Sequence, residues 1–235
     1  MAIKVVKLGG SMISKDPVSM FDIKYLFDLK ALILKQYGYD STKFMLVAGG
    51  GSVMRKYRDL LMEGGITNER NIHWVGTAVN VLHAMILKSV FDASCDEEVL
   101  KFEDYYKDEP LTIENVVKVG GGGRPGHSGD VDTVISAKRL GSDVVFSLKN
   151  VDGVYDSDPN KNPTAKHLDK LTWDEYMDVI GHPTEHTPGA NYPIDPIASN
   201  MAKEAGIEFI VLHGGDLQNF EKALKGEPFI GTIIK

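Results

Sequence analysis

The sequence has almost no cysteine: Cys95 is the only one among 235 residues. A single thiol excludes a disulfide framework and a cysteine-based zinc site within one chain. A chain without disulfides is typical of a reducing compartment, so we expect a cytoplasmic protein. Cys95 lies in the polar stretch 92–98, and we expect no catalytic role for it.

Positive charge is also scarce relative to negative charge. The chain has 26 Lys and Arg residues against 33 Asp and Glu, which gives a net charge of −7. No run of basic residues interleaved with aromatic ones is present, and this argues against a nucleic acid as partner. A phosphate-bearing ligand would therefore be bound by a few well-placed groups.

Long hydrophobic runs are missing as well. No uninterrupted apolar stretch reaches the roughly 18–20 residues that span a bilayer, and the chain opens directly into a predicted strand. We therefore expect neither a membrane segment nor a signal peptide.

What the sequence does contain is a regular alternation of apolar runs and amphipathic segments. A chain of this length can bury one large core or two modest ones. Strand–helix alternation is typical of an α/β domain with a mostly parallel sheet. The predicted strands are 3–8, 44–47, 116–119, 144–148 and 207–212. The predicted helices are 22–36 with Gly38 as its stop, 53–62, 72–91, a helix from 130 ended by Gly141, a helix from 172, a helix from 193 ended by Gly206, and 220–224.

Three of these strands end in glycine-rich loops. The first ends at Gly9 and Gly10 with Lys7 beside them, so a phosphate could approach backbone N–H groups and an ammonium together. The second runs into 49–51 at the start of a helix, where free N–H groups attract anions. The third is followed by four glycines, 120–123. Because glycines lose much conformational entropy on folding, four in a row indicate a need for unusual φ angles or for close approach of a ligand. The alternative reading of each loop is a tight turn without a ligand.

The stretch 144–165 carries the strongest signal. Its strand ends at Asn150 and continues through Asp152-Gly153, which favours a turn. A polar loop with prolines at 159 and 163 follows. Such a loop lies just beyond the carboxyl end of a strand, where open α/β sheets bind their ligands. An acidic turn without function is the simpler alternative.

NVDGVYDSDP at 150–159, followed by NPTA at 162–165, resembles the nucleotide-binding signature of the amino acid kinase family, most closely its archaeal-type uridylate (UMP) kinase branch. KLGGS at 7–11, GGGS at 49–52, HSGD at 127–130 and GTII at 231–234 resemble further motifs of that family. The resemblance implies a three-layer α/β/α sandwich with a largely parallel central sheet. It implies one domain over 1–235, with an acceptor-binding and dimerisation lobe at 1–140 and an ATP-binding lobe at 141–235.

The resemblance also implies roles for individual residues. Lys7 would contact the transferred phosphate, Lys161 the donor phosphates, and Asp130 would orient the lysines, although a carboxylate at a helix start can equally be a cap. The implied ATP-binding residues are Gly9, Gly10, Ser11, Asn150, Asp152, Gly153, Tyr155, Asp158 and Pro159. The implied acceptor-binding residues are Gly49, Gly50, Gly51, Arg55, His73, Gly121, Gly122, His127 and Ser128.

The implied cofactors and partners are ATP with Mg²⁺, a small phosphate acceptor with UMP as the best guess, and further copies of the chain in a dimer or hexamer. Mg²⁺ would be bound mainly by phosphates and water, and no metal-ligating residue is assigned. Two histidines four apart in the predicted surface loop 181–193, His182 and His186, suggest a metal site only on a helix, which the prolines there disfavour. Lys7 should lie at the same edge of the sheet as Asp152 and Tyr155.

Three positions depart from the uridylate kinase pattern, all on the acceptor side. His73 stands where an aspartate is usual, His83 where an asparagine is usual, and Gly129 where a threonine is usual. A lone histidine on such a helix is more often a hydrogen-bonded core group than a ligand. The prediction is an ATP-dependent phosphotransferase that converts UMP to UDP. Two alternatives stay open: a kinase with another small phosphate or carboxylate acceptor, and an ATP-binding protein of the same fold that stores molybdate or tungstate.

Overall fold

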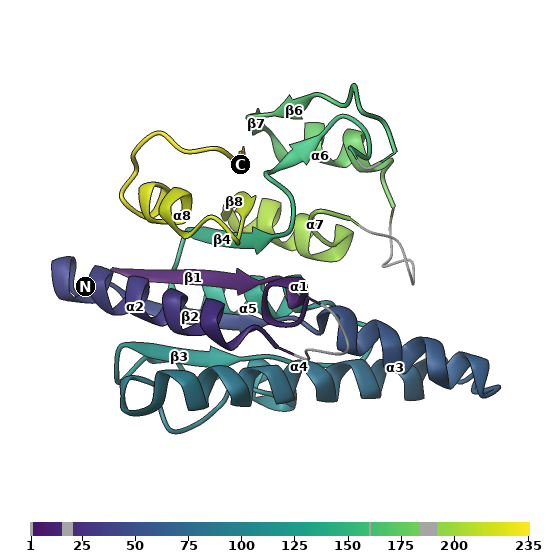
Figure 1. Cartoon of the computed structure of the whole chain (residues 1–235), viewed down its shortest axis with the longest axis horizontal. Coiled ribbons are helices and arrows are strands. Elements are labelled where there is room, and N and C mark those ends of the chain that lie inside the picture. The colour runs from purple at the N-terminus through teal and green to yellow at the C-terminus, as the bar shows by residue number, and fades with distance from the viewer. Residues whose placement is uncertain (1, 16–20, 160, 184–191) are drawn as a thin grey trace.

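The structure, a computed structural model, describes residues 2–15, 21–159, 161–183 and 192–235. A seven-stranded sheet in the order β3-β2-β1-β4-β8-β9-β7 runs through the middle of the molecule (Figure 1). Its pairs are parallel except β8 with β9. The strands are β1 (Ile3–Leu8), β2 (Lys43–Ala48), β3 (Val117–Gly120), β4 (Val144–Lys149), β7 (Lys170–Leu171), β8 (Glu208–His213) and β9 (Thr232–Ile234). A separate hairpin pairs β5 (Val154–Tyr155) with β6 (His167–Leu168).

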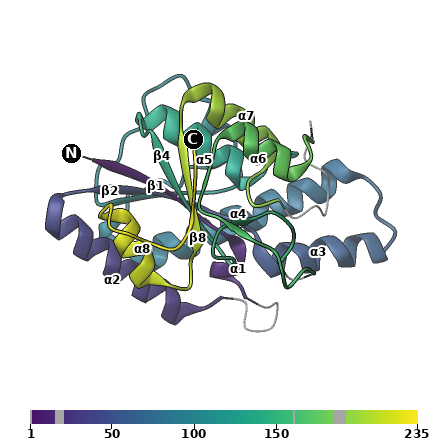
Figure 2. The same cartoon turned by 90° about the horizontal axis from the view of Figure 1, so that it is seen from above.

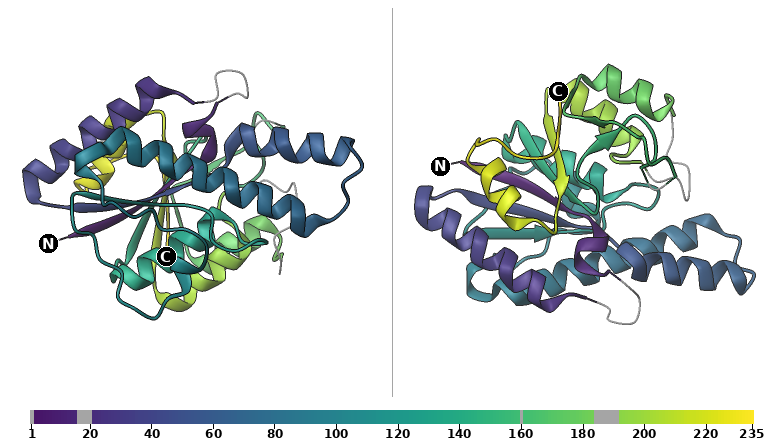
Figure 3. Two further views of the ribbon diagram at one scale, coloured as in Figure 1. Left: turned by 90° about the horizontal axis from the view of Figure 1, so that it is seen from below. Right: turned by 45° about the horizontal axis from the view of Figure 1, so that its top comes forward.

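Helices cover both faces of the sheet (Figure 2). One apolar core joins the sheet to α1 (Gly10–Ile13), α2 (Ile23–Asp40), α4 (Glu69–Phe91) and α8 (Leu217–Leu224). A second core joins the opposite face to α5 (Gly129–Leu140), α6 (Trp173–Ile180) and α7 (Pro196–Ala205). The predicted three-layer α/β/α sandwich is therefore confirmed. The remaining helix, α3 (Gly51–Glu63), packs against α4, and both project beyond the carboxyl ends of the strands (Figure 3).

The alternation of side chains along β1 decides where its lysine points. Val6 and Leu8 belong to the core beneath α2 and α4, whereas Val5 belongs to the core beneath α5. Because successive side chains on a strand point to opposite faces, Lys7 shares the α5 face with Val5. The pairing of Lys7 with Ser147 puts the ends of β1 and β4 at the same edge of the sheet. Lys149, two residues beyond Ser147, consequently faces α5 as well.

Several predicted boundaries move for local reasons. The helix predicted to stop at Gly38 continues to Asp40, because Ser41 adopts a left-handed φ of 59° and donates its N–H to the carbonyl of Tyr37 at 2.8 Å. Helix α8 begins at Leu217 rather than 220, since the carboxylate of Asp216 caps it. The helix predicted from residue 172 begins with a capping box, in which the side chains of Thr172 and Glu175 bond each other's backbone N–H groups.

Helix α4 bears on the expectation that the chain has no membrane segment. The segment Glu69–Ser94 is long and apolar enough to cross a membrane by length and composition, with 44 % of its most apolar window buried. The buried side packs against β2, β3 and α2, so the apolar character is that of a helix covering a sheet. Short 3₁₀ turns, η1 (Asp92–Ser94) and η2 (Phe102–Tyr106), then lead toward β3.

Part of the predicted loop at 181–193, including His186, lies outside the described residues. His182, at its described start, is exposed and hydrogen-bonds the carboxylate of Asp178 through Nε2.

Candidate active site

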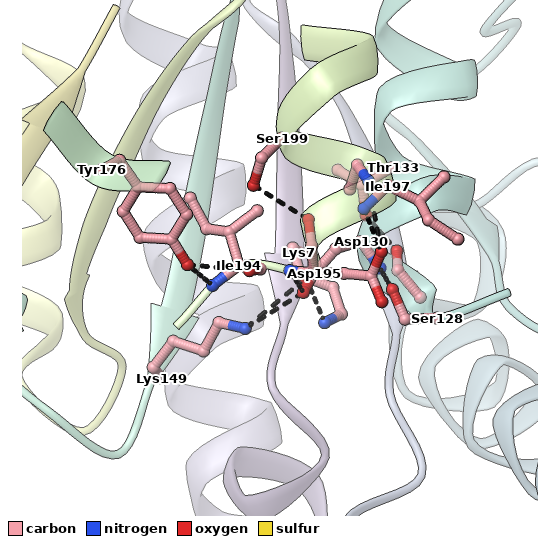
Figure 4. A network of polar contacts seen from close by, with 12 residues as sticks. Lys7, Ser128, Asp130, Thr133, Lys149, Tyr176, Ile194, Asp195, Ile197 and Ser199 are labelled. Carbon is pink, nitrogen blue, oxygen red and sulfur yellow. Dashed lines mark hydrogen bonds and ion pairs between the residues drawn. The ribbon is translucent and has the colours of Figure 1, made fainter. Parts of the chain in front are cut away.

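Two lysines and one aspartate meet at the carboxyl edge of the sheet (Figure 4). Lys7 Nζ, from β1, donates to Asp130 Oδ1 at 2.7 Å, and Lys149 Nζ, from β4, lies 3.5 Å from both Asp130 oxygens. The three side chains are almost entirely buried, with 8 %, 16 % and 7 % exposed for Lys7, Lys149 and Asp130. The cluster therefore joins β1, β4 and the start of α5 at one point.

The electrostatics of this cluster favour an anionic ligand. Burial by itself raises the pKa of Asp130, but Lys149, Lys7 and the N–H of Asp195 together hold that pKa well below its usual value. Burial lowers the pKa of Lys149 to about 8, with Asp130 acting in the opposite direction. One carboxylate cannot neutralise two ammonium groups, so a phosphate placed beside them would complete the charge balance.

Neighbouring residues keep Asp130 in place. The N-cap of α5 is Ser128, whose Oγ accepts from the N–H of Asp130 at 3.2 Å. The capping role considered for Asp130 is thus taken by Ser128, which leaves the carboxylate for the lysines. On the other side, the hydroxyl of Tyr176 bonds both backbone groups of Ile194 at 2.7 Å, and Asp195 N–H then donates to Asp130 Oδ2 at 3.2 Å.

A cavity of about 540 Å³ opens beside Lys7. Its floor is formed by the first and second glycine loops and by the start of α5, and its walls by α3 and α4. Free N–H groups at the starts of α3 and α5 add positive potential there. The residues that line the cavity include Lys7, Gly10, Gly49, Gly50, Arg58, His73, His127 and Ser128. We refer to this space as the Lys7 cavity.

A second cavity, of about 320 Å³, opens beside Lys149. The loop after β4 and the end of α6 line it, including Asn150, Gly153, Tyr155, Asp158 and Pro159. We refer to it as the Lys149 cavity. Asp130 therefore binds two lysines, of which Lys7 lines the first cavity and Lys149 lines the second. Lys7 also lies at the same edge of the sheet as the loop that carries Asp152 and Tyr155.

The predicted site residues divide into those that line a cavity and those that serve packing. Gly10 and Gly51 bring the starts of α1 and α3 into contact, since a Cβ on Gly10 would lie 1.8 Å from Gly51 N. Gly121 and Gly122 pack on the backbone of α4, where a Cβ would meet the carbonyls of Asn80 and Thr77 at 2.7 and 2.4 Å. Gly9, Ser11, Gly51, Asp152, Gly121 and Gly122 line neither cavity among the described residues.

Two basic residues lie away from the places expected for them. Arg55 is exposed on α3, whereas Arg58 lines the Lys7 cavity and also pairs with Asp59 at 2.8 Å. Lys161 is 86 % exposed and lies 3.6 Å from Asp158. The structure thus brings Lys149, and not Lys161, to Asp130.

Of the three histidines near the Lys7 cavity, two line it and one is buried in the core. His73 and His127 line the Lys7 cavity. His83 is buried, and its Nδ1 lies 2.7 Å from the carbonyl oxygen of Gly49. Burial lowers the pKa of His83, which favours the neutral ring. His83 is therefore a hydrogen-bonded core histidine, which is the commoner of the two roles considered for a histidine on this helix.

Sequence reasoning missed Lys149, Arg58 and Asp195. Lys149 carried a usable signal, because it is a charged residue at the end of an otherwise apolar strand, as Lys7 is. Arg58 differs from Arg55 only by about one helical turn, which periodicity does not resolve without knowing the helix start. Asp195 contributes a backbone N–H, and no sequence pattern reports that.

A carboxylate that binds two lysines between two cavities, at the carboxyl edge of a parallel sheet, defines a site of the phosphotransferase class. The chain belongs to the amino acid kinase family, whose family model matches residues 2–213.

Curated relatives agree over nearly the full length. The uridylate kinase of Methanocella arvoryzae is 35 % identical over 233 residues, 98 % of each chain. That of Thermoplasma volcanium is 32 % identical over 244 residues, 98 % of this chain and 96 % of the relative. The crystal structure of uridylate kinase from Archaeoglobus fulgidus superposes with a TM-score of 0.79 at 28 % identity, covering 100 % of both chains.

Proposed function

We propose that this chain is an ATP-dependent kinase that transfers the γ-phosphate of ATP to UMP. The observation that carries the proposal is the position of Lys7, Asp130 and Lys149 between two cavities. Relatives that bear the name uridylate kinase match over 98 % of this chain, which supports UMP as the acceptor. The Lys149 cavity would take ATP, and the Lys7 cavity would take UMP.

Phosphoryl transfer from ATP to UMP requires the protein mainly to position the two substrates and to supply positive charge. The phosphate of UMP is anionic near neutral pH, so its oxygen needs no general base to attack the γ-phosphorus. Catalysis then consists of bringing two anions together and neutralising the charge that spreads over the transferred group. Lys7 and Lys149 would supply that positive charge, and Asp130 would hold both ammonium groups in place before either substrate binds.

Mg²⁺ would enter as part of the donor substrate. Within the part of the chain that the structure describes, no three His, Cys, Asp or Glu side chains gather where they could hold a metal ion. The described residues therefore do not form a resident metal site, and the phosphates of ATP and water would supply the ligands of the ion.

The two cavities support the proposed lobes. Every residue that lines the Lys7 cavity comes from the first 129 residues, and every residue that lines the Lys149 cavity comes from 149–193. This separation supports the proposal of an acceptor lobe at 1–140 and an ATP lobe at 141–235. Exposed apolar side chains on α3 and α4, including Leu60, Met62, Trp74 and Met85, support a homo-oligomer formed through the first lobe.

The two alternative functions are less well supported. The departures from the uridylate kinase pattern at His73, His83 and Gly129 are the reason to consider another small phosphate or carboxylate as acceptor. Of these three residues, His83 bonds the carbonyl of Gly49, whereas His73 and Gly129 line the Lys7 cavity. Storage of molybdate or tungstate was suggested by histidines near the cleft, of which only His73 and His127 line it. The named relatives favour neither alternative.

An acceptor panel tests the proposal. The purified protein, with ATP and Mg²⁺, would be offered UMP, CMP, AMP, GMP, acetate and carbamate at equal concentrations, and product formation would be followed by chromatography. We expect UDP to form at least tenfold faster than any other product, since the acceptor must fill a defined cavity. UMP reacting no faster than the others would refute the assignment. Metal analysis of the same sample would detect a storage protein.

A further inference from the structure

A buried carboxylate that the mechanism above does not use, that of Asp132, lies two residues beyond Asp130 on α5. Asp132, on α5, is 1 % exposed. Its Oδ2 accepts from Gly123 N–H at 3.0 Å, and its Oδ1 has no hydrogen-bond partner among the described residues. Burying a carboxyl group is costly unless it is paired, so packing alone does not explain an aspartate here. Neighbouring inward positions on the same helix, such as Val134 and Ala137, are apolar.

The partner of Asp132 is the last glycine of the third glycine loop. The loop closes tightly on the carboxylate, because a Cβ on Gly123 would lie 2.2 Å from Asp132 Oδ1. Earlier residues of the loop are fixed elsewhere: Gly121 N–H donates to the carbonyl of Leu100 at 3.0 Å, and Gly122 accepts from Phe102 N–H at 2.8 Å. The side chain of Asp132 therefore holds the chain at Gly123, just after the end of β3.

The segment that follows Gly123 reaches the Lys7 cavity. Gly126, His127 and Ser128 line that cavity, and Ser128 is at the same time the N-cap of α5. The segment 123–128 is thus tied to α5 at both ends, by the side chain of Asp132 and by that of Ser128. Between the two ties, its own backbone bond is His127 N–H to the carbonyl of Arg124, at 3.2 Å.

We propose that Asp132 is a positioning residue for the acceptor: by holding Gly123 it sets the place of His127 and Ser128 in the Lys7 cavity, without touching either substrate. The proposal rests on the proposed function only for the identity of the acceptor, UMP. Positioning of the loop itself does not depend on that identity.

The surroundings of Asp132 add a second consequence. The titratable groups that face it are Lys7 on β1, Asp130 on its own helix, and Tyr105 and Tyr106 on η2. The hydroxyl of Tyr105 is buried and, among the described residues, also has no hydrogen-bond partner. Burial raises the pKa of Asp132 to about 7, with Gly123 N–H and Lys7 opposing the effect. Near neutral pH the group therefore changes charge beside the site of an anionic acceptor, and the ionised form repels it.

Two substitutions separate these roles. Asp132→Asn keeps an oxygen that can accept from Gly123 N–H and removes the titration. Asp132→Val keeps a side chain of comparable size and removes the acceptor. For Asp132→Val we expect the KM for UMP to rise about fivefold to tenfold, the usual effect of one lost hydrogen bond, with the KM for ATP and kcat within twofold of the parent protein. Asp132→Asn should restore the KM for UMP measured at pH 6.

The pH profile provides the readout that a purely structural role would not change. Because UMP itself ionises near pH 6, the KM of the parent protein is divided by that of Asp132→Asn at each pH. We expect this ratio to rise between pH 6 and pH 8, as Asp132 loses its proton in the parent protein only. A flat ratio, or an unchanged KM for UMP in Asp132→Val, would overturn the proposal.

A measurement without substrate keeps the proposal testable if UMP is not the acceptor. Amide hydrogen exchange of the peptide spanning 121–128 should be at least fivefold faster in Asp132→Val than in the parent protein and in Asp132→Asn. Val134→Ala serves as the control, since it removes buried volume from α5 without touching the loop. Equal exchange in all four proteins would refute the positioning role, whereas failure of the parent protein to phosphorylate UMP would refute only the proposed function.

Discussion

Lys7 and Lys149 lie on neighbouring parallel strands and bind the same buried carboxylate, that of Asp130, at 2.7 and 3.5 Å. Each lysine also lines one of the two cavities. A single carboxylate therefore fixes the distance between the groups that would meet the donor and the acceptor.

Lys7 should be needed for turnover and not for folding. Replacing it by Met keeps most of its volume and removes the ammonium group, so kcat should fall by about 10²–10³-fold, as for the loss of a group that stabilises transition-state charge. Lys4→Met is the matched control, because Lys4 lies on the same strand with its ammonium 5.8 Å from the ring centroid of Phe146. Steady-state kinetics with saturating UMP and ATP measure the effect; equal activity of the two variants would remove Lys7 from the mechanism.

Lys149 should give the reaction an upper pH limit. Its pKa of about 8 means that the free enzyme loses this positive charge as the pH rises through that value, and kcat/KM for ATP should fall above about pH 8. In Lys149→Arg the fall should move to higher pH, since a guanidinium stays protonated. The pH dependence of kcat/KM measures this.

Lys161→Met is the comparison for Lys149, because the sequence indicated Lys161 for the same task. Its side chain is 86 % exposed, so we expect its loss to change kcat less than that of Lys149→Met. The opposite order would favour Lys161 as the residue that meets the donor phosphates.

Asp130→Asn should reduce both activity and stability. Removing one partner of a buried ion pair typically costs about 3–5 kcal/mol, and here two ammonium groups would lose their carboxylate. The lowered pKa of Asp130 means that its stabilising effect is complete above about pH 5 and is lost as the pH falls through 3.8 and below. Denaturant unfolding at pH 7 and pH 3 should therefore show a large difference between parent and variant at pH 7 and a smaller one at pH 3. A difference that grows toward low pH would contradict this.

Arg58, and not Arg55, should bind the acceptor phosphate. Arg58→Ala should raise the KM for UMP by about tenfold, the effect of a lost hydrogen bond to a charged group, and leave the KM for ATP unchanged. Arg55→Ala, on the same helix and exposed, is the control and should behave as the parent protein. The reverse outcome would restore the role that the sequence motif gave to Arg55.

The fold class and the general nature of the site could be predicted from the amino-acid sequence alone. Apolar runs alternating with amphipathic segments specified a parallel sheet covered by helices, because each element must bury one face or stripe. Glycines at strand ends, with Lys7 and the loop at 150–159, pointed to a phosphate site at the carboxyl edge. These are local patterns, and local backbone and packing preferences are enough to produce them.

Which side chains meet at the site depends on how the strands and helices are arranged in space. Lys149 reaches Asp130 because β4 pairs with β1 in a register that places Lys7 beside Ser147, and strand order is a non-local property. Gly121 and Gly122, which resembled ligand-binding glycines, contact the backbone of α4, and Asp132 lies buried against Gly123. Such contacts join segments far apart in the chain and depend on how the layers pack, so no spacing along the sequence could reveal them.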